Sequence, residues 1–177
     1  MVELDFETRC PHYGQCGGCS LQHLSLENYL AQKQNQVQQA FDDHSIKITA
    51  DPILACPPQS RRRVTLSAKR DQTEIRIGFQ QHRSHELVDI DQCLVALPRL
   101  VDLLPVLRSF APILLQRSQM VQFTLSDCNN GFDLGLALET PLSETETSDL
   151  VRLLARSPFL RCAMEGDVIF ELSLIHI

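Results

Sequence analysis

The chain has 177 residues and a formal net charge of −6, with 44% hydrophobic and 21% charged side chains. This is the composition of a folded protein with one core and a small appendage, which excludes a disordered chain. No apolar run approaches the roughly 20 residues that cross a bilayer, and the N-terminus lacks the basic and apolar regions of a signal peptide. We therefore expect a cytoplasmic protein with no membrane partner.

The most informative motif of the sequence is a cysteine-rich loop near the N-terminus. Cys10, Cys16 and Cys19 fall within the stretch CPHYGQCGGC, and glycines between them allow a short loop to turn its thiolates toward one centre. In a reducing compartment the seven cysteines of the chain favour metal binding or catalysis over disulfides. We interpret residues 1–24 as a metal-binding loop.

Hydrophobic periodicity beyond the loop predicts an α+β protein. Helical patterns cover residues 25–41, 98–110 and 143–156. The alternation typical of strands covers residues 64–69, 75–79, 86–90, 121–125, 132–138, 160–164 and 168–171. The first helix has a Ser25 cap and a polar middle, Pro105 is expected to kink or split the second, and Ser143 with Glu146 forms a capping box for the third. We predict a mostly antiparallel sheet with flanking helices over residues 44–171.

The spacing of the cysteines argues for an iron–sulfur cluster. Cys-x5-Cys-x2-Cys lacks the second knuckle of a zinc ribbon, so a fourth ligand must come from far along the chain, as is usual for a cluster held by four thiolates. Cys93 is the favoured fourth ligand because it follows a predicted strand, and Cys128 is the alternative. His12 and His23 are expected to pack beside the site rather than to bind metal.

A basic segment interrupts the acidic chain at the predicted hairpin. Its cations are Arg61, Arg62, Arg63, Lys69 and Arg76. Arginine clusters on a sheet suit RNA, through bidentate bonds to phosphates and stacking on bases. The alternative is a solvated basic face that balances the acidic remainder.

These motifs resemble a known family. The stretch RCPHYGQCGGC with Gln22-His23-Leu24 is similar to the iron–sulfur region of bacterial RNA 5-methyluridine methyltransferases, above all the 23S rRNA (uracil-5-)-methyltransferases. Further similarity lies at Arg61-Arg62-Arg63, Ile77-Gly78-Phe79, Leu87-Val88-Asp89 and Asp91-Gln92-Cys93, and the resemblance covers most of residues 9–171.

The resemblance implies cofactors and a partner. Cys10, Cys16, Cys19 and Cys93 would hold a [4Fe-4S] cluster with a structural, RNA-positioning role, and the five cations would contact RNA, which the resemblance identifies as 23S rRNA. The family transfers a methyl group from S-adenosylmethionine to C5 of a flipped-out uracil after a cysteine thiolate adds to C6.

The family's methyltransferase domain is not matched by this sequence. No cysteine here stands in the nucleophile context and no glycine-rich loop follows a strand, so we assign no catalytic residue. We expect a monomeric fragment, inactive by itself, in which S-adenosylmethionine is bound by a missing domain, helix 25–43 packs on that domain, and residues 172–177 are a non-native tail. The alternatives are a tRNA uracil-5-methyltransferase of the same family and a non-catalytic iron–sulfur or zinc protein that binds RNA.

Overall fold

The computed structural model describes residues 10–172, and residues 1–9 and 173–177 lie outside the described part, including most of the expected tail. The four helices are α1 (Leu26–Asp43), α2 (Pro98–Val101), α3 (Leu104–Leu114) and α4 (Glu144–Leu154). The seven strands are β1 (Arg63–Asp71), β2 (Glu74–Gln80), β3 (Leu87–Asp89), β4 (Met120–Cys128), β5 (Gly131–Leu138), β6 (Phe159–Met164) and β7 (Asp167–Glu171).

The strands form one sheet in the order β3-β2-β1-β4-β5-β6-β7. Five of the six pairings are antiparallel, and β5 with β6 is the parallel one. A parallel pair needs a crossover connection, which α4 supplies. The prediction of an α+β fold on a mostly antiparallel sheet is confirmed. Directly after β7, Leu172 N donates to Leu160 O of β6 at 2.8 Å.

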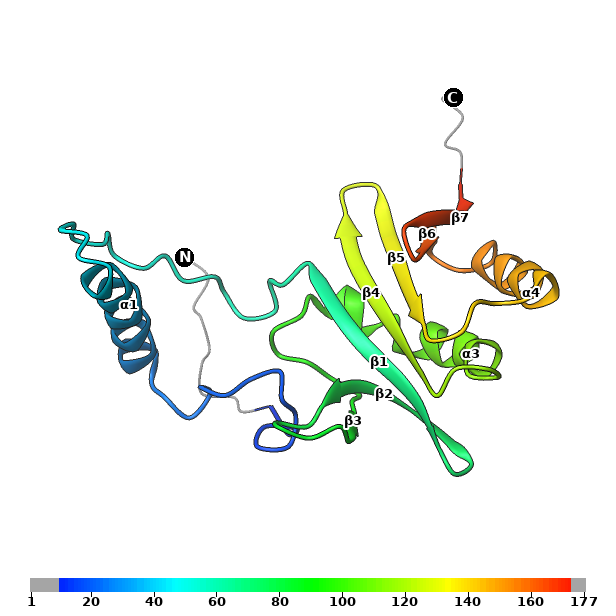
Figure 1. Cartoon of the computed structure of the whole chain (residues 1–177), viewed down its shortest axis with the longest axis horizontal. Coiled ribbons are helices and arrows are strands. Elements are labelled where there is room, and N and C mark those ends of the chain that lie inside the picture. The colour runs from blue at the N-terminus through cyan, green and yellow to red at the C-terminus, as the bar shows by residue number, and fades with distance from the viewer. Residues whose placement is uncertain (1–9, 173–177) are drawn as a thin grey trace.

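Helices α2, α3 and α4 lie on the same side of the sheet (Figure 1). Strict alternation sends the large apolar side chains of β1, β4 and β5 to that side. The fully buried members of the core include Phe123, Leu125 and Leu134 from the sheet, Leu107 and Phe110 from α3, and Leu150 and Leu154 from α4. The ring centres of Phe110 and Phe159 lie 6.1 Å apart, which joins α3 to β6.

The other side of the sheet, which we call the open face, carries small and polar side chains. Its central members are Thr65, Ser67, Gln122, Thr124, Gly135 and Ala137. The hydroxyl oxygens of Thr65 and Thr124 lie 3.1 Å apart across β1 and β4. Thr65, Gln122 and Ala137 are exposed. An antiparallel sheet with one solvated face has this alternation, as the sequence predicted.

Proline placement explains the break between α2 and α3. Pro98 and Pro105 stand in the first turns of the two helices, where a missing N–H removes no helical hydrogen bond. The expected interruption is therefore confirmed as a split. The predicted capping box of α4 is also present, because Ser143 Oγ accepts from Glu146 N at 3.3 Å and Glu146 Oε2 accepts from Ser143 N at 2.7 Å.

Helix α1 projects away from the sheet and connects to β1 through a long extended segment (Figure 1). Ser25 caps it as predicted, and none of its residues, all of them described, is buried. The chain turns back after the helix and is held along it by two glutamines, Gln34 and Gln38, whose side chains bond the backbone of Ile48 and Ala50 at 3.0 Å. No helix among residues 10–172 has the length and apolar character needed to cross a membrane.

Candidate four-cysteine site

The cysteine loop is braced by its own turns and side chains. Tyr13 N donates to Cys10 O at 2.9 Å, and Cys16 N donates to His12 O at 2.8 Å. The Tyr13 hydroxyl donates to Ser20 O at 3.1 Å and lies 2.7 Å from His23 Nδ1. His23 therefore supports the loop, in agreement with the packing role predicted for it.

The loop docks on the end of β2 through its backbone. Gly17 N donates to Gln80 O at 2.9 Å, and Cys16 forms a bridge with Gln81. A Cβ atom on Gly17 would lie 2.7 Å from Gln80 O, closer than real Cβ atoms approach a backbone oxygen. Glycine is therefore required where the loop meets the sheet.

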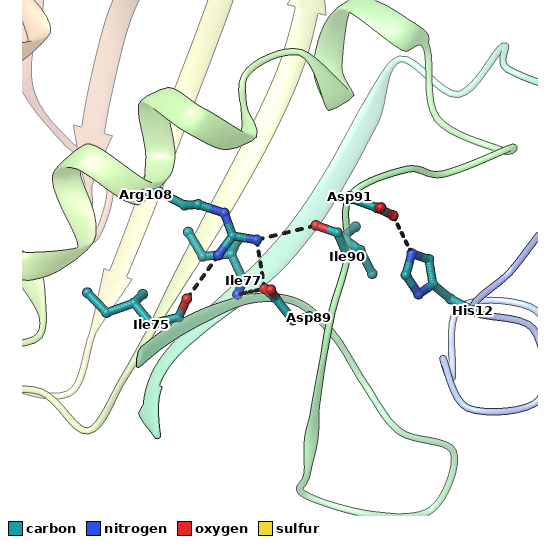
Figure 2. A network of polar contacts seen from close by, with 7 residues as sticks. All are labelled: His12, Ile75, Ile77, Asp89, Ile90, Asp91 and Arg108. Carbon is teal, nitrogen blue, oxygen red and sulfur yellow. Dashed lines mark hydrogen bonds and ion pairs between the residues drawn. The ribbon is translucent and has the colours of Figure 1, made fainter. Parts of the chain in front are cut away.

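Cys93 lies in the segment that follows β3, and this segment lies beside the cysteine loop. It lies four residues beyond the end of β3, which pairs with β2, and Ile90 N extends this pairing by donating to Ile77 O at 3.0 Å. Arg108 of α3 bonds Asp89 Oδ1 at 2.8 Å and Ile75 O at 2.9 Å, which ties the edge of the sheet to the helix layer (Figure 2).

All four predicted cysteines line one cavity. Cys10, Cys16 and Cys19 come from the loop and Cys93 from the segment after β3, with apolar walls from Phe79 and Ile90. The four thiols are half-buried. The structure thus brings together residues up to 83 positions apart, counted from Cys10 to Cys93.

The remaining cysteines lie elsewhere. Cys128, the alternative fourth ligand, is exposed at the end of β4, and Cys56 is exposed in the segment before β1. Burial raises the pKa of Cys162 to about 12, so this core thiol is protonated and unreactive at neutral pH. Neither Cys56, Cys128 nor Cys162 lines the four-cysteine cavity.

The four thiols affect one another electrostatically. Burial raises the pKa of Cys16 and of Cys19, and the neighbouring cysteines of the cavity raise it further. Two hydrogen bonds oppose this rise: Gly18 N donates to Cys16 Sγ at 3.4 Å, and the Gln22 side chain bonds Cys19. Gln22 also accepts from Cys10 N at 3.2 Å, so one amide supports two of the cysteines.

The thiols are not arranged around a single ion. Among the described residues, no three side chains of His, Cys, Asp or Glu lie close enough together to hold one metal ion. A tetrahedral zinc site, with Zn–S bonds of about 2.3 Å, needs its sulfurs about 3.8 Å apart. A four-iron cluster is wider than one ion, so its thiolates stand further apart.

The five predicted RNA-contacting cations have different surroundings. Arg61 lines the four-cysteine cavity, and its backbone pairs with Val95 and Leu97 at 3.0 Å. Arg76 forms an ion pair of 2.8 Å with Asp71. The exposed Arg63 and Lys69 lie on the open face near the two ends of β1, and neither forms an ion pair within residues 10–172.

Arg62 belongs to a cluster that the sequence did not reveal. Its Nε lies 3.4 Å from Asp127 Oδ2, and Arg99 Nε lies 3.1 Å from Asp127 Oδ1. The Asp127 side chain is only 6% exposed, and the Arg99 guanidinium stacks 4.6 Å from the Phe132 ring centre. Charge patterns in the sequence carry no signal for this contact, because Asp127 lies in β4, 65 residues after Arg62.

His12 is a second contact not foreseen from the sequence. Its Nε2 lies 2.9 Å from Asp91 Oδ1, and this hydrogen bond lowers the pKa of the Asp91 carboxyl (Figure 2). The sequence carried no signal for this direction: β3 ends at Asp89, and strand alternation would place residues two positions apart on the same face, whereas Asp89 meets α3 and Asp91 meets the loop.

Comparisons with known proteins support the resemblance. No family model matches the chain. The chain is 32% identical over 162 residues to an uncharacterised RNA methyltransferase of Brucella suis, which covers 92% of the chain and 39% of the relative. It is 33% identical over 178 residues to the 23S rRNA (uracil(1939)-C(5))-methyltransferase RlmD of Haemophilus parainfluenzae, covering 96% of the chain and 39% of the relative.

A solved structure shares the fold. The tRNA (uracil-54, C5)-methyltransferase of Pyrococcus abyssi, in complex with S-adenosyl-L-homocysteine, matches with a TM-score of 0.57 at 18% identity, over 90% of this chain and 41% of that chain. The chain spans about two-fifths of the length of the curated relatives that it matches along nearly all of its own length. Over nearly all of its own length, the chain is similar to RNA methyltransferases, and among these relatives are enzymes named 23S rRNA uracil-C5 methyltransferases.

Proposed function

We propose that this chain is the iron–sulfur and RNA-recognition part of an S-adenosylmethionine-dependent 23S rRNA uracil-C5 methyltransferase. The observation that carries the proposal is the convergence of four cysteines, from two distant segments, on one cavity in a chain related to such enzymes. We favour 23S rRNA as the substrate because two curated relatives, 33% identical over 96% of the chain and 41% identical over 56% of it, are named for that RNA.

The residues that would hold a [4Fe-4S] cluster are Cys10, Cys16, Cys19 and Cys93. Two features of the cavity support this: the four half-buried thiols and the apolar walls around them. When bound, the cluster supplies a covalent cross-link between the loop and the sheet edge. Gly17 and Gln22 of this chain hold the loop in place for it.

The proposed RNA surface is the basic side of β1 and β2, beside the four-cysteine cavity. Arg63 and Lys69 would contribute most because they form no ion pair within the described chain. Arg61, Arg62 and Arg76 would contribute with the part of each guanidinium that faces solvent; the side chains of Arg62 and Arg76 are 55% and 47% exposed.

Methyl transfer would take place outside this chain, in the three-fifths of the relatives' length that it does not match. Helix α1 is the element we propose to pack against that part, because it has no buried residue here and Val37 is 39% exposed. Slow amide exchange of α1 in the isolated chain would contradict this assignment.

Anaerobic reconstitution with iron and sulfide tests the proposal. We expect a coloured protein with about four irons and four sulfides per chain, because four thiolates are available. Replacing Cys10, Cys16, Cys19 or Cys93 by serine should abolish stable cluster binding. The matched controls C56S and C128S should bind as the wild type does. A colourless protein that purifies with zinc would overturn the cluster assignment.

A further inference from the structure

The segment that carries Cys93 is held from two sides. Asp89 points to α3, where it accepts from Arg108 Nη2 at 2.8 Å and from Ile77 N at 2.6 Å. Asp91, two residues later, points to the cysteine loop and meets His12 (Figure 2). Buried Ile90 lies between them, 3% exposed, so the strand cannot rotate without losing core contacts.

The two contacts act on different parts of the molecule. Arg108 with Asp89 joins the segment to the helix layer and does not involve the loop. His12 with Asp91 is, among the side-chain hydrogen bonds of residues 10–172, the one that joins the loop to the segment before Cys93. The other attachment of the loop is backbone pairing with the end of β2 at Gly17.

We propose that His12 and Asp91 are positioning residues that clasp the four-cysteine site. The inference rests on the proposed function. Three thiols move with the loop and the fourth moves with the sheet edge, so a single attachment at Gly17 leaves a hinge between them. The clasp adds a second attachment on the Cys93 side and fixes the distance between the two sets of thiols.

The exposed fractions of the two side chains distinguish the proposed positioning role from a role in core packing. The His12 side chain is 18% exposed and that of Asp91 is 81% exposed. Loss of the Asp91 carboxylate therefore leaves no cavity, and the core of the sheet does not depend on it. Removal of Arg108 is different, because its guanidinium bonds three groups of the sheet edge.

The test compares H12A and D91A with two matched controls, H85A and D102A, which replace exposed residues of the same types on a neighbouring turn and beside α2. With cluster loaded anaerobically, we expect iron release to a chelator to be about three- to tenfold faster in H12A and D91A, the size of one ordinary net hydrogen bond. The double variant H12A/D91A should release iron no faster than the single variants, because both remove the same contact. The variant D91N keeps an acceptor oxygen and should fall between D91A and the wild type.

A second measurement on the metal-free chain keeps the two proposals separable. Amide exchange in residues 10–24 should accelerate in H12A and D91A, while exchange in β4 and β5 and the Tm of the metal-free chain should stay as in the wild type. Unchanged loop exchange would overturn the clasp even if the wild type binds a cluster. If the Tm of H12A and D91A fell together with the faster loop exchange, the His12–Asp91 contact would have a general structural role, and this result would also overturn the clasp proposal. A wild type that takes up no iron would defeat the proposed function, and loop exchange would still decide the clasp.

Discussion

Gly17 attaches the cysteine loop to the sheet. Its backbone N–H anchors the loop to Gln80, and its missing side chain permits the approach. The neighbouring Gly18 is less constrained, because a Cβ there would meet Cys16 Sγ at 3.4 Å. The two adjacent glycines of the motif therefore have different roles.

The variant G17A should lift the loop from the end of β2. A methyl group 2.7 Å from Gln80 O forces the backbones apart and breaks a hydrogen bond worth about 1 kcal/mol. We expect amide exchange at residues 16–22 to be about five- to tenfold faster, measured by mass spectrometry, and cluster retention to fall. G18A is the control, with a much smaller effect. Equal exchange in both variants would contradict the role given to Gly17.

The sequence does not show which of the five predicted RNA-contacting cations form ion pairs within the protein. Five cations of the hairpin form one group in the sequence, yet Arg62 is held by Asp127 and Arg76 by Asp71. A buried carboxylate such as Asp127 requires cationic partners, and the fold decides which ones are near enough. The sequence predicted the positive charge of this surface but not its division between structural and free cations.

At the scale of single elements, α4 depends on its N-terminal cap. The hydrogen bonds from Ser143, through its side chain and then its backbone, lower the pKa of Glu146 below its ordinary value of 4.5, and Arg117 lowers it further. Since the folded pKa is the lower one, the ionised carboxylate stabilises the fold above pH 4.5, and this stability is lost as pH falls through the folded pKa.

The variant E146A should lower the stability of the protein at neutral pH, because it removes the carboxylate that accepts from Ser143 in the capping box. Its loss of stability on acidification below pH 4.5 should also be shallower than that of the wild type. Thermal unfolding between neutral pH and pH 3 measures both effects. E144A removes an acidic residue from the same turn and serves as the control. A wild-type pH profile in E146A would show that the carboxylate contributes nothing to the cap.

At the scale of the whole molecule, the sheet separates two environments. One side is covered by α2, α3 and α4 (Figure 1). The open face presents hydroxyl, amide and glycine positions on β1, β4 and β5, with Arg63 and Lys69 near the two ends of β1. The net charge of −6 makes most of the protein repel nucleic acid. We therefore expect RNA to bind at the open face, and the RNA proposal is tested there.

The double variant R63A/K69A should bind a 23S rRNA fragment more weakly and with a shallower salt dependence. Each lost phosphate contact reduces the slope of log K against log salt by about 0.7 to 0.9, so two contacts should reduce it by about 1.4 to 1.8. Affinity measured at several salt concentrations gives the slope. R152A is the control, since Arg152 lies on α4 and pairs with Asp149 at 3.0 Å. Parallel salt plots for wild type and R63A/K69A would exclude phosphate contacts by Arg63 and Lys69.

The sequence by itself determined the local structure: the helices, the strands, the split near Pro105 and the cap of α4 all follow from periodicity and from residues close in the chain. It also identified the four cysteines: three of them lie within ten residues of one another, and the fourth, Cys93, follows a predicted strand. Tertiary structure alone decided the strand order, the parallel pairing of β5 with β6, and the contacts of His12 with Asp91 and Arg62 with Asp127. Those features join residues 65 or more positions apart or depend on the packing of whole elements, and no short-range pattern in the chain encodes such distances.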